Sequence, residues 1–462
     1  MLVPAILGCA LFMQTLDSTI VANALPAMAV SLHEDPLRLN LAISCYFLST
    51  AVFLPWSGWA ADKYGSRRVL NAAIVVFAAS SLLCGLSTNL VQLIAARVLQ
   101  GAAGATMVPV GRMVLFKSLP KSQFVRATAV LTMPALLGPV IGPVVGGAIV
   151  TFADWRWIFY INIPIGILGV VLVSMFVPDI REPEVGRLDL RGFVLIAFGL
   201  AGLIFGLENA GGSSLSPATV CAMIVGGALC LWLYYLHARN RDNAIVDLRL
   251  LRIPTYFAAL VGGAFTRLVL GSTPFLLAML LQVVFGLSAF DAGLLTFTGA
   301  VGAFFMKTTA PPIIRRFGFR RVLVVNTVAS GILQIGYALF TPTTPYAIAA
   351  TVLFSAGFLR SLQFTALGAM AFADVPAARM SGASSLSSVG QQVSQAIGVA
   401  LAAFVLYTVQ RLRHTSQLTT AEVAPGFVIV GLLSLIALWF YRRLSHDAAA
   451  EVSGHRAPNS PE

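Results

Sequence analysis

Long apolar runs recur along almost the whole chain, and they constrain the fold more than any other feature of the sequence. A bilayer hydrocarbon core about 30 Å thick is crossed by a helix of about 20 apolar residues. Only 10% of the 462 residues are charged and 58% are hydrophobic, whereas about 25% of the residues of a soluble domain are charged. The chain is therefore predicted to be an integral membrane protein.

The runs are predicted to be helices rather than barrel strands. They are rich in Ala, Leu, Val, Gly and Phe, and they lack the alternating polar pattern of membrane strands. A helix satisfies its own backbone hydrogen bonds in lipid, which a single strand cannot do. We expect an all-α protein with fourteen transmembrane helices near residues 4–30, 39–60, 69–87, 90–113, 124–151, 156–178, 191–209, 217–237, 256–282, 290–311, 322–341, 345–371, 383–409 and 426–441.

The net charge of +12 would suit a nucleic-acid partner, but the basic residues are distributed as in a membrane protein. If the N-terminus is cytoplasmic, the cytoplasmic loops and tail hold 22 of the 30 Lys and Arg residues. The external loops hold only Arg38, Arg156, Arg411 and Arg413. Because basic residues are enriched on the cytoplasmic side of a membrane, we expect both termini in the cytoplasm and no nucleic-acid partner.

Two loops of the chain resemble each other. GWAADKYGSRR (58–68) aligns with PPIIRRFGFRR (311–321), so that Gly65 meets Gly318 and both Arg-Arg pairs coincide. Parallel repeats of this kind are a known transporter architecture. We therefore expect an N-terminal six-helix bundle (1–180), two inserted helices (181–240), a C-terminal six-helix bundle with a preceding interfacial segment (241–445) and a disordered tail (446–462).

The cysteines and the search for enzyme motifs give no indication of a metal site or of catalysis. The five cysteines all fall in apolar runs and show no disulfide or metal spacing, so they are predicted to be small buried hydrophobic residues. The sequence contains no His-Glu-x-x-His, Gly-x-Ser-x-Gly or Gly-Lys-Ser/Thr motif. We expect no catalytic residues, no metal and no cofactor, and an ion gradient as the energy source.

Four motifs together resemble the major facilitator superfamily, within it the fourteen-span drug:proton antiporters. The loop Gly58-x-x-x-Asp62-x-x-Gly65-x-Arg67-Arg68 is similar to the superfamily's loop signature. The other three are LDSTIVANALP (16–26), RVLQGAAGA (97–105) and GPVIGPVVGG (138–147). The resemblance implies a major facilitator fold of two six-helix bundles plus two helices, and export of small molecules in exchange for protons.

The loop at 58–68 is a candidate gate. Gly58 would let two helices approach closely, and Asp62 lies where nearby Arg side chains and helix termini can hold it. The resemblance implies that Gly58, Asp62, Gly65, Arg67 and Arg68 latch the two halves together on the cytoplasmic side. The alternative is a topology anchor made by the basic residues alone. In the second copy Pro311 and Arg315 replace Gly58 and Asp62, so that copy is expected to be mostly an anchor.

Asp17 lies deep within the first apolar run, with Gln14 one turn before it. A carboxylate at this depth is costly unless it is protonated or reaches a polar cavity. We expect Asp17, with Gln14, to serve proton or substrate coupling; a structural hydrogen bond to a neighbouring helix is the alternative. The resemblance implies proton handling by Arg97, for which bonding to helix carbonyls is the structural alternative.

Three further cations lie in predicted spans of the C-terminal half: Arg267, Lys307 and Arg360. Each could pair with an acid, line a cavity or attract an anionic substrate. Snorkelling to an interface is the alternative, and it suits Lys307 best because this residue lies near a span end.

The fifth run carries closely spaced Gly and Pro residues, which predict a close-packed and bendable helix. The resemblance links this pattern with antiporters, which implies a hinge; a simple packing face is the alternative. The residues concerned are Gly138, Pro139, Gly142, Pro143, Gly146 and Gly147.

The sequence thus predicts a proton-coupled multidrug exporter that works by alternating access in a bacterial-type inner (plasma) membrane. Its partners would be a small-molecule substrate, protons and the lipid bilayer, and a monomer is the simplest expectation. Export of a specific metabolite or organic anion on the same fold is the main alternative, since buried cations suit an anionic cargo. A non-transporting membrane sensor is a further alternative.

Overall fold

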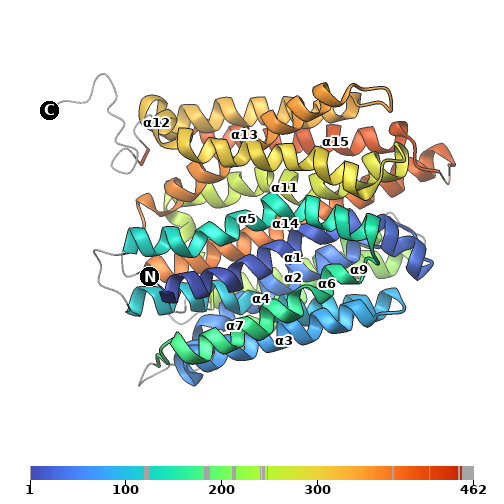
Figure 1. Ribbon diagram of the computed structural model, residues 1–462. Helices are drawn as coiled ribbons and strands as arrows, with labels where there is room; N and C mark the ends of the chain where they lie inside the picture. The colour runs from blue at the N-terminus through green and yellow to red at the C-terminus, as the bar shows by residue number, and fades with distance from the viewer. Residues whose placement is uncertain are drawn as a thin grey trace. The chain divides into compact units, whose positions relative to one another are not determined.

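A computed structural model describes residues 2–118, 124–181, 188–210, 215–239, 241, 245–246, 248–376, 379–415, 417–445 and 448–449. Every regular element within these residues is a helix, so the all-α prediction is confirmed (Figure 1). Thirteen helices in the described part are long and apolar enough to cross a membrane. The remaining predicted span coincides with α5 (Phe124–Phe152). Apart from Ala448 and Ala449, the predicted tail lies outside the described residues.

The first compact unit comprises Met1–Val246 and Leu287–Gly293. In it α1 packs on α5 and α7, α4 packs on α2 and α3, and α8 and α9 form a hairpin beside α2. The further helices of this unit are α1 (Leu2–Leu32), α2 (Asn40–Tyr64), α3 (Ser66–Leu86), α4 (Leu90–Ser118), α6 (Trp157–Tyr160), α7 (Asn162–Phe176), α8 (Leu190–Asn209) and α9 (Pro217–Ala238).

The second compact unit comprises Asp247–Gly286 and Leu294–Glu462. In it α11 packs on α14 and α15, and α10 packs on α13. The helices that begin in or before this unit are η2 (Leu248–Arg252), α10 (Pro254–Phe257), η3 (Ala258–Gly262), α11 (Gly263–Ala278), η4 (Met279–Val284), α12 (Ala289–Gly336), η5 (Tyr337–Leu339), α13 (Tyr346–Ala373), α14 (Met380–Arg413), α15 (Thr420–Leu435) and α16 (Ala437–Arg442).

One acidic side chain, Asp189, fixes the start of α8 and the end of α9. The Asp189 carboxylate caps α8 by accepting from Gly192 N at 3.0 Å, and it lies 2.8 Å from His237 Nε2 at the end of α9. Burial would raise the pKa of Asp189, but these hydrogen bonds outweigh it and hold the pKa below its usual value. One carboxylate thereby closes the hairpin of α8 and α9.

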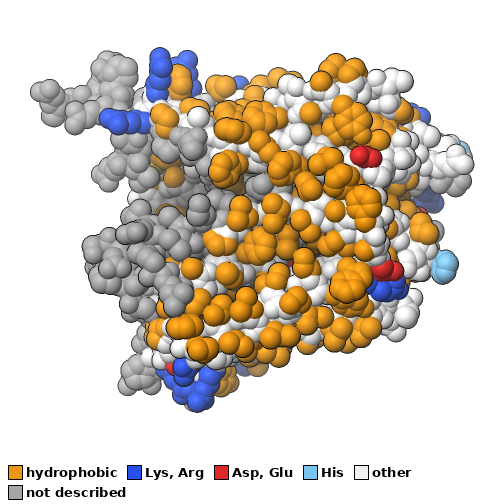
Figure 2. Space-filling view, viewed as in Figure 1, with side chains coloured by type: hydrophobic (Ala, Val, Ile, Leu, Met, Phe, Trp, Pro, Cys, Tyr) orange, Lys and Arg blue, Asp and Glu red, His pale blue; other side chains and the backbone are white. Residues whose placement is uncertain are grey.

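The outward surfaces of the helices are apolar. In the most apolar stretch of α2, 72% of residues are buried, against 17% in α9. Large side chains such as Leu83, Ile167 and Trp232 are half exposed or more, and hydrophobic atoms cover much of the face shown in Figure 2. Such a surface suits lipid rather than water, since soluble proteins expose only small apolar patches.

Two regions of the spans have local features that were not predicted, and one expectation about the cysteines needs correction. The predicted spans 290–311 and 322–341 are present as two helices that follow each other directly in α12, where the non-helical backbone of Gly318 separates them. The span near 256–282 is interrupted at both ends by the π-helical turns η3 and η4. Among the cysteines, Cys45 and Cys84 are buried as predicted, whereas Cys9 and Cys221 are exposed.

Candidate functional site

Asp17 and Arg97 form a buried ion pair in the first unit. Asp17 lies at the middle of α1 and Arg97 two turns into α4, and Arg97 Nη1 is 2.6 Å from Asp17 Oδ2. Both side chains are at most 1% exposed. Burial of either charge alone would cost several kcal/mol, so each group offsets the desolvation of the other.

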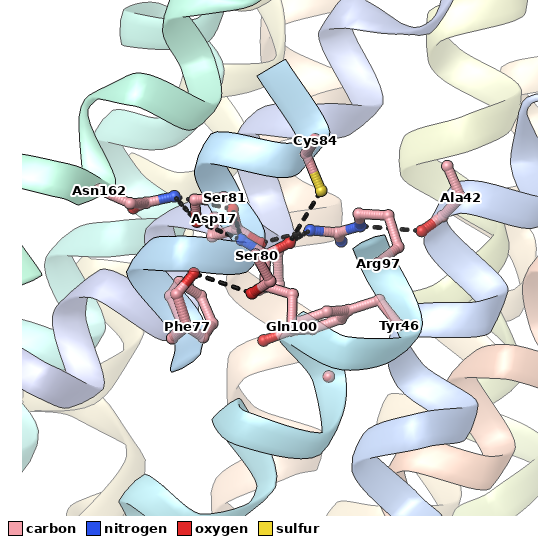
Figure 3. Close-up of polar contacts among 12 residues, drawn as sticks. Asp17, Ala42, Tyr46, Phe77, Ser80, Ser81, Cys84, Arg97, Gln100 and Asn162 are labelled. Atoms are coloured by element: carbon pink, nitrogen blue, oxygen red, sulfur yellow. Dashed lines mark hydrogen bonds and ion pairs between the residues drawn. The ribbon is translucent and has the colours of Figure 1, made fainter. Parts of the chain in front are cut away.

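Two side-chain amides hold the other carboxylate oxygen. Gln100 Nε2 and Asn162 Nδ2 each donate to Asp17 Oδ1 at 2.9 Å. Gln100 follows Arg97 by one turn of α4, so both side chains leave the same face of that helix, while Asn162 begins α7. Figure 3 shows these groups converging on the carboxylate. Asp17 therefore accepts three hydrogen bonds from two neighbouring helices.

Arg97 is fixed on its remaining sides by α2 and by Gln100. Its Nε donates to the backbone carbonyl of Ala42 at 3.0 Å, and its Nη1 also donates to Gln100 Oε1. The guanidinium carbon lies 4.2 Å from the centre of the Tyr46 ring, in cation–π geometry. The cation is thus held by a carboxylate, two carbonyl-type oxygens and an aromatic face.

Ser81 of α3 completes the arrangement. Its hydroxyl accepts from Gln100 Nε2 at 2.6 Å and from Asn162 Nδ2 at 3.2 Å. We refer to the connected set as the Asp17 cluster, which comprises Asp17, Ala42, Tyr46, Ser81, Arg97, Gln100 and Asn162. Its residues belong to α1, α2, α3, α4 and α7. A change in its hydrogen bonds would therefore alter the packing of five helices.

The structure brings together only part of the predicted set. Gln14 is buried beside Tyr46, and its Oε1 has no hydrogen-bond partner among the described residues. Gln100, Asn162 and Ser81 are members that the sequence predictions missed. All three are polar residues inside apolar runs, and that pattern was the available signal.

The predicted gating loop packs against the segment that follows α7. Ser66 N donates to Ile180 O at 2.9 Å, and Arg67 N donates to Asp179 Oδ1 at 3.2 Å. Helix α3 begins here without a side-chain cap of its own, so Asp179 satisfies one of its unpaired N–H groups. Gly65 has φ 95°, and a Cβ at this position would collide with the Asp179 carboxylate. The turn therefore requires glycine for both conformation and space.

Gly58 differs from its predicted role. A Cβ built on this residue meets no atom within 4 Å, so close helix approach does not explain it here. Asp62 is half-buried in the last turn of α2, and Arg68 is exposed at the start of α3. Whether these residues gate the protein stays a prediction.

The second copy of the loop repeats the backbone turn. Gly318, which aligns with Gly65, also has positive φ, at 72°. Both glycines break a helix just before the Arg-Arg pair, so the repeat is structural as well as sequential. The side chain of Pro311, which aligns with Gly58, lies outside the described residues.

The Gly-Pro run forms a close contact between α5 and α1. A Cβ on Gly138 would lie 2.7 Å from the backbone N of Leu16, and one on Gly142 would collide with Thr19. Thr19 Oγ1 donates to Gly138 O at 3.3 Å, and Asn23 Nδ2 donates to Pro143 O at 2.9 Å. Gly146 faces Ile20 and Gly147 faces Ala289, while the side chain of Pro139 lies outside the described residues. The packing face is present, and the hinge stays a prediction.

The three cations of the C-terminal half have different surroundings. Arg267 is 8% exposed, in agreement with its predicted burial. Arg360 is half-buried rather than buried, near Gly299 and Tyr337. The Lys307 side chain lies outside the described residues. None of them belongs to the Asp17 cluster, which lies wholly in the first unit.

Comparison with known proteins places these features in a family. The profile of the Major Facilitator Superfamily matches residues 7–399. The chain is 41% identical over 401 residues to "Putative multidrug resistance protein MdtD" of Salmonella heidelberg (strain SL476), covering 87% of this chain and 85% of that protein. It is 37% identical over 451 residues to the protein of the same name from Escherichia coli (strain K12), covering 97% and 96%.

Solved structures agree on the fold. A D-xylose-proton symporter matches with a TM-score of 0.68 at 14% identity, covering 96% of this chain and 98% of that chain. An auto-inhibited POT family peptide transporter matches with a TM-score of 0.69 at 15% identity, covering 96% and 97%. At this identity the likeness shows the fold alone, and the predicted major facilitator fold is confirmed.

Proposed function

This chain belongs to the major facilitator superfamily, and from that premise we propose that it is a proton-coupled exporter of small amphipathic compounds. It works by alternating access, has no catalytic role and needs no cofactor, because the proton gradient supplies the energy. The relatives named as multidrug resistance proteins support the class of cargo. The helices long enough to cross a membrane support a multi-pass protein.

The Asp17 cluster is the observation that carries the proposal. Asp17 is a carboxylate at mid-helix, and its charge is balanced by Arg97 at 2.6 Å. When a proton adds to a carboxylate oxygen of Asp17, the pair loses its Coulombic attraction while Arg97 keeps its bond to Ala42 O. When that proton leaves to the other side of the membrane, the pair forms again.

This cycle gives proton binding a mechanical consequence. The partners of Asp17 come from α4 and α7, and Ser81 of α3 links the two amides. Loss of the ion pair therefore loosens contacts among four helices of one bundle. An alternating-access transporter needs such a link, because two conformations must differ in their affinity for the proton.

The loop at 58–68 and the α5 helix have supporting roles in this proposal. Asp62 and Arg68, with Gly58, form the cytoplasmic latch, and the contact of Gly65 with Asp179 keeps the latch in place. Helix α5 bends at its Gly-Pro run while α1 slides along it. The bias of basic residues supports cytoplasmic termini and an inner-membrane location.

The experiment is transport by the purified protein in proteoliposomes with an imposed pH gradient. We expect a cationic dye such as ethidium to move uphill only when protons flow in the opposite direction. An Asp17→Asn protein should bind the dye but lose uphill movement, while an Asp17→Glu protein should keep it with a changed pH profile. Asp154→Asn, which alters an exposed acid, is the matched control.

Three results would count against the proposal. Uphill, proton-dependent transport by Asp17→Asn would remove Asp17 from the coupling step. Equal losses in Asp154→Asn would show that the assay does not report the cluster. Dye binding without any flux by the wild-type protein would favour a membrane sensor over a transporter.

A further inference from the structure

Arg267 lies near the middle of the apolar span Pro254–Val284 in the second unit. It lies 13 residues after Pro254, which is about 20 Å along a helix axis, so lipid headgroups at the surface are out of reach. Its segment of helix lies between two π-helical turns, η3 and η4. π-Helical turns are rare in proteins as a whole, and those that occur are often found at functional sites.

Part of the hydrogen-bonding capacity of Arg267 is unused within the described residues. The side chain is 8% exposed, and its Nη1 donates to Ala259 O at 3.2 Å. Its Nε has no hydrogen-bond partner among the described residues. A guanidinium has five N–H donors, so an acceptor is missing at this position.

The described part of the second unit supplies no counter-charge to Arg267. Its acids with described side chains are Asp374 and Glu422. Asp374 accepts from Thr255 Oγ1 at 2.7 Å, and Glu422 caps α15 while lying 3.7 Å from Arg413. Both acids are engaged at helix ends, and no ion pair joins either one to Arg267.

A tyrosine hydroxyl without a partner lies beside the guanidinium. A Cβ on Gly263 would lie 2.7 Å from Arg267 Nη1, and one on the preceding Gly262 would lie 3.0 Å from the Tyr441 ring. The Tyr441 hydroxyl is buried near Arg267, Thr266 and Gln363, and it makes no hydrogen bond of good geometry with a described residue. Tyr256, also near Arg267, is held in place because its hydroxyl donates to Ala383 O at 2.7 Å. The glycines leave the space that these side chains occupy.

We propose that Arg267 and Tyr441 form a subsite that binds one carboxylate group of an amphipathic organic anion carried by this protein. The guanidinium would supply the balancing charge and two or more donors, and the Tyr441 hydroxyl would supply another. An anion in this position would satisfy the buried donors and balance the buried charge at once. The inference rests on the proposed transport function and adds carboxylate-bearing compounds to its cargo.

The test measures binding by the full-length protein in detergent, using three probes of one shape. These are 2-naphthoate, its uncharged amide 2-naphthamide, and the cation 2-naphthylmethylamine, at constant chloride concentration. We expect 2-naphthoate alone to raise the unfolding temperature of the wild-type protein. Arg267→Gln should weaken its binding by about tenfold or more, the loss expected for a charged hydrogen bond.

Control variants separate recognition from folding. Arg267→Lys should retain part of the affinity, and Tyr441→Phe should reduce it less than Arg267→Gln does. Arg411→Gln, at an exposed position near the end of α14, should bind like wild type. Equal shifts by naphthoate and naphthamide, or displacement of naphthoate by chloride at similar concentration, would overturn the carboxylate subsite.

The outcome for this subsite is separable from the outcome for the transport function. If ethidium is exported with protons but naphthoate neither binds nor moves, the transport function stands and the subsite is wrong. If naphthoate binds through Arg267 and neither probe is transported, the subsite stands and the transport function is wrong.

Discussion

The two units of the protein place buried charge on corresponding helices but balance it differently. Asp17 lies on the first helix of the first six-helix repeat, and Arg267 lies on the first helix of the second. Asp17 meets Arg97 at 2.6 Å and two amides. Arg267 meets one backbone carbonyl and no acid among the described residues. The charges of the first cluster balance each other, whereas the described acids of the second unit do not balance Arg267.

The rest of each cluster also corresponds. In the first unit the third and fourth helices supply Ser81 and Gln100. In the second unit the third and fourth helices supply Thr327 and Gln363, whose Nε2 donates to Thr327 Oγ1 at 3.0 Å. A polar connection between these helices is therefore common to both repeats. The difference lies in the charge, which suggests a proton site in one repeat and a cargo site in the other.

The largest expected effect comes from removing Arg97. Arg97→Met should lower the stability by about 3–5 kcal/mol, because it leaves the buried Asp17 charge without a partner. Thermal unfolding in detergent would measure this loss. Asp17→Asn combined with Arg97→Met should recover part of it, and a double variant as unstable as the sum of the singles would show that the pair is not coupled.

The bridging glutamines give the next comparison. Gln100→Leu should cost about 1–3 kcal/mol, since it leaves Asp17 and Ser81 short of donors. Gln363→Leu removes bonds to Thr327 and Asn326 and should cost less, because neither partner is charged. Chemical denaturation in mixed micelles can rank the two. A larger loss for Gln363→Leu would mean that charge does not set the difference between the clusters.

Glycine contacts between the first and fifth helices of each repeat should have comparable effects. A Cβ on Gly138 would meet the backbone of Leu16, and one on Gly271 would meet the backbone of Gln395. Gly138→Ala and Gly271→Ala should therefore each destabilise by about 1–3 kcal/mol. Gly58→Ala, where nothing lies within 4 Å, should leave the unfolding temperature nearly unchanged. If Gly58→Ala slows transport without loss of stability, the gating role is supported.

The smallest expected effect is that of Arg267→Met in the absence of an anion. Removal of an unbalanced buried cation should leave stability unchanged or raise it by about 1 kcal/mol. The same measurement that shows a large loss for Arg97→Met would serve here. A loss of similar size for Arg267→Met would mean that the protein already balances this charge, and the contrast between the two units would disappear.

Much of this fold was predictable because each span carries its own signal. The helices begin and end within a few residues of the predicted runs, since apolar length alone sets what crosses a membrane. The direct junction of two spans in α12 was not predictable, because the non-helical backbone at Gly318 is confined to one residue and leaves no loop between the helices. Nor were η3 and η4, whose extra residue per turn leaves no pattern in composition.

The candidate site was predicted in part. Asp17 and Arg97 stood out as charges inside apolar runs, while Gln100, Asn162 and Ser81 did not, because uncharged polar residues are common in membrane helices. Gln14 was chosen for its spacing from Asp17, yet its side chain lies beside Tyr46 of α2. Spacing along one helix shows which residues share a face, but it does not show which helix that face meets.

The sequence by itself determined the class of protein, the spans, the family and the charges that a membrane must accommodate. Only the tertiary structure decided which of those charges are balanced. Asp17 and Arg97 are separated by 80 residues, and they meet because α1 and α4 are rotated so that both side chains enter the same interior. Arg267 has no such partner, because the described acids of its unit lie at helix ends. Charge balance inside a membrane depends on distances between helices, which is information that no single span contains.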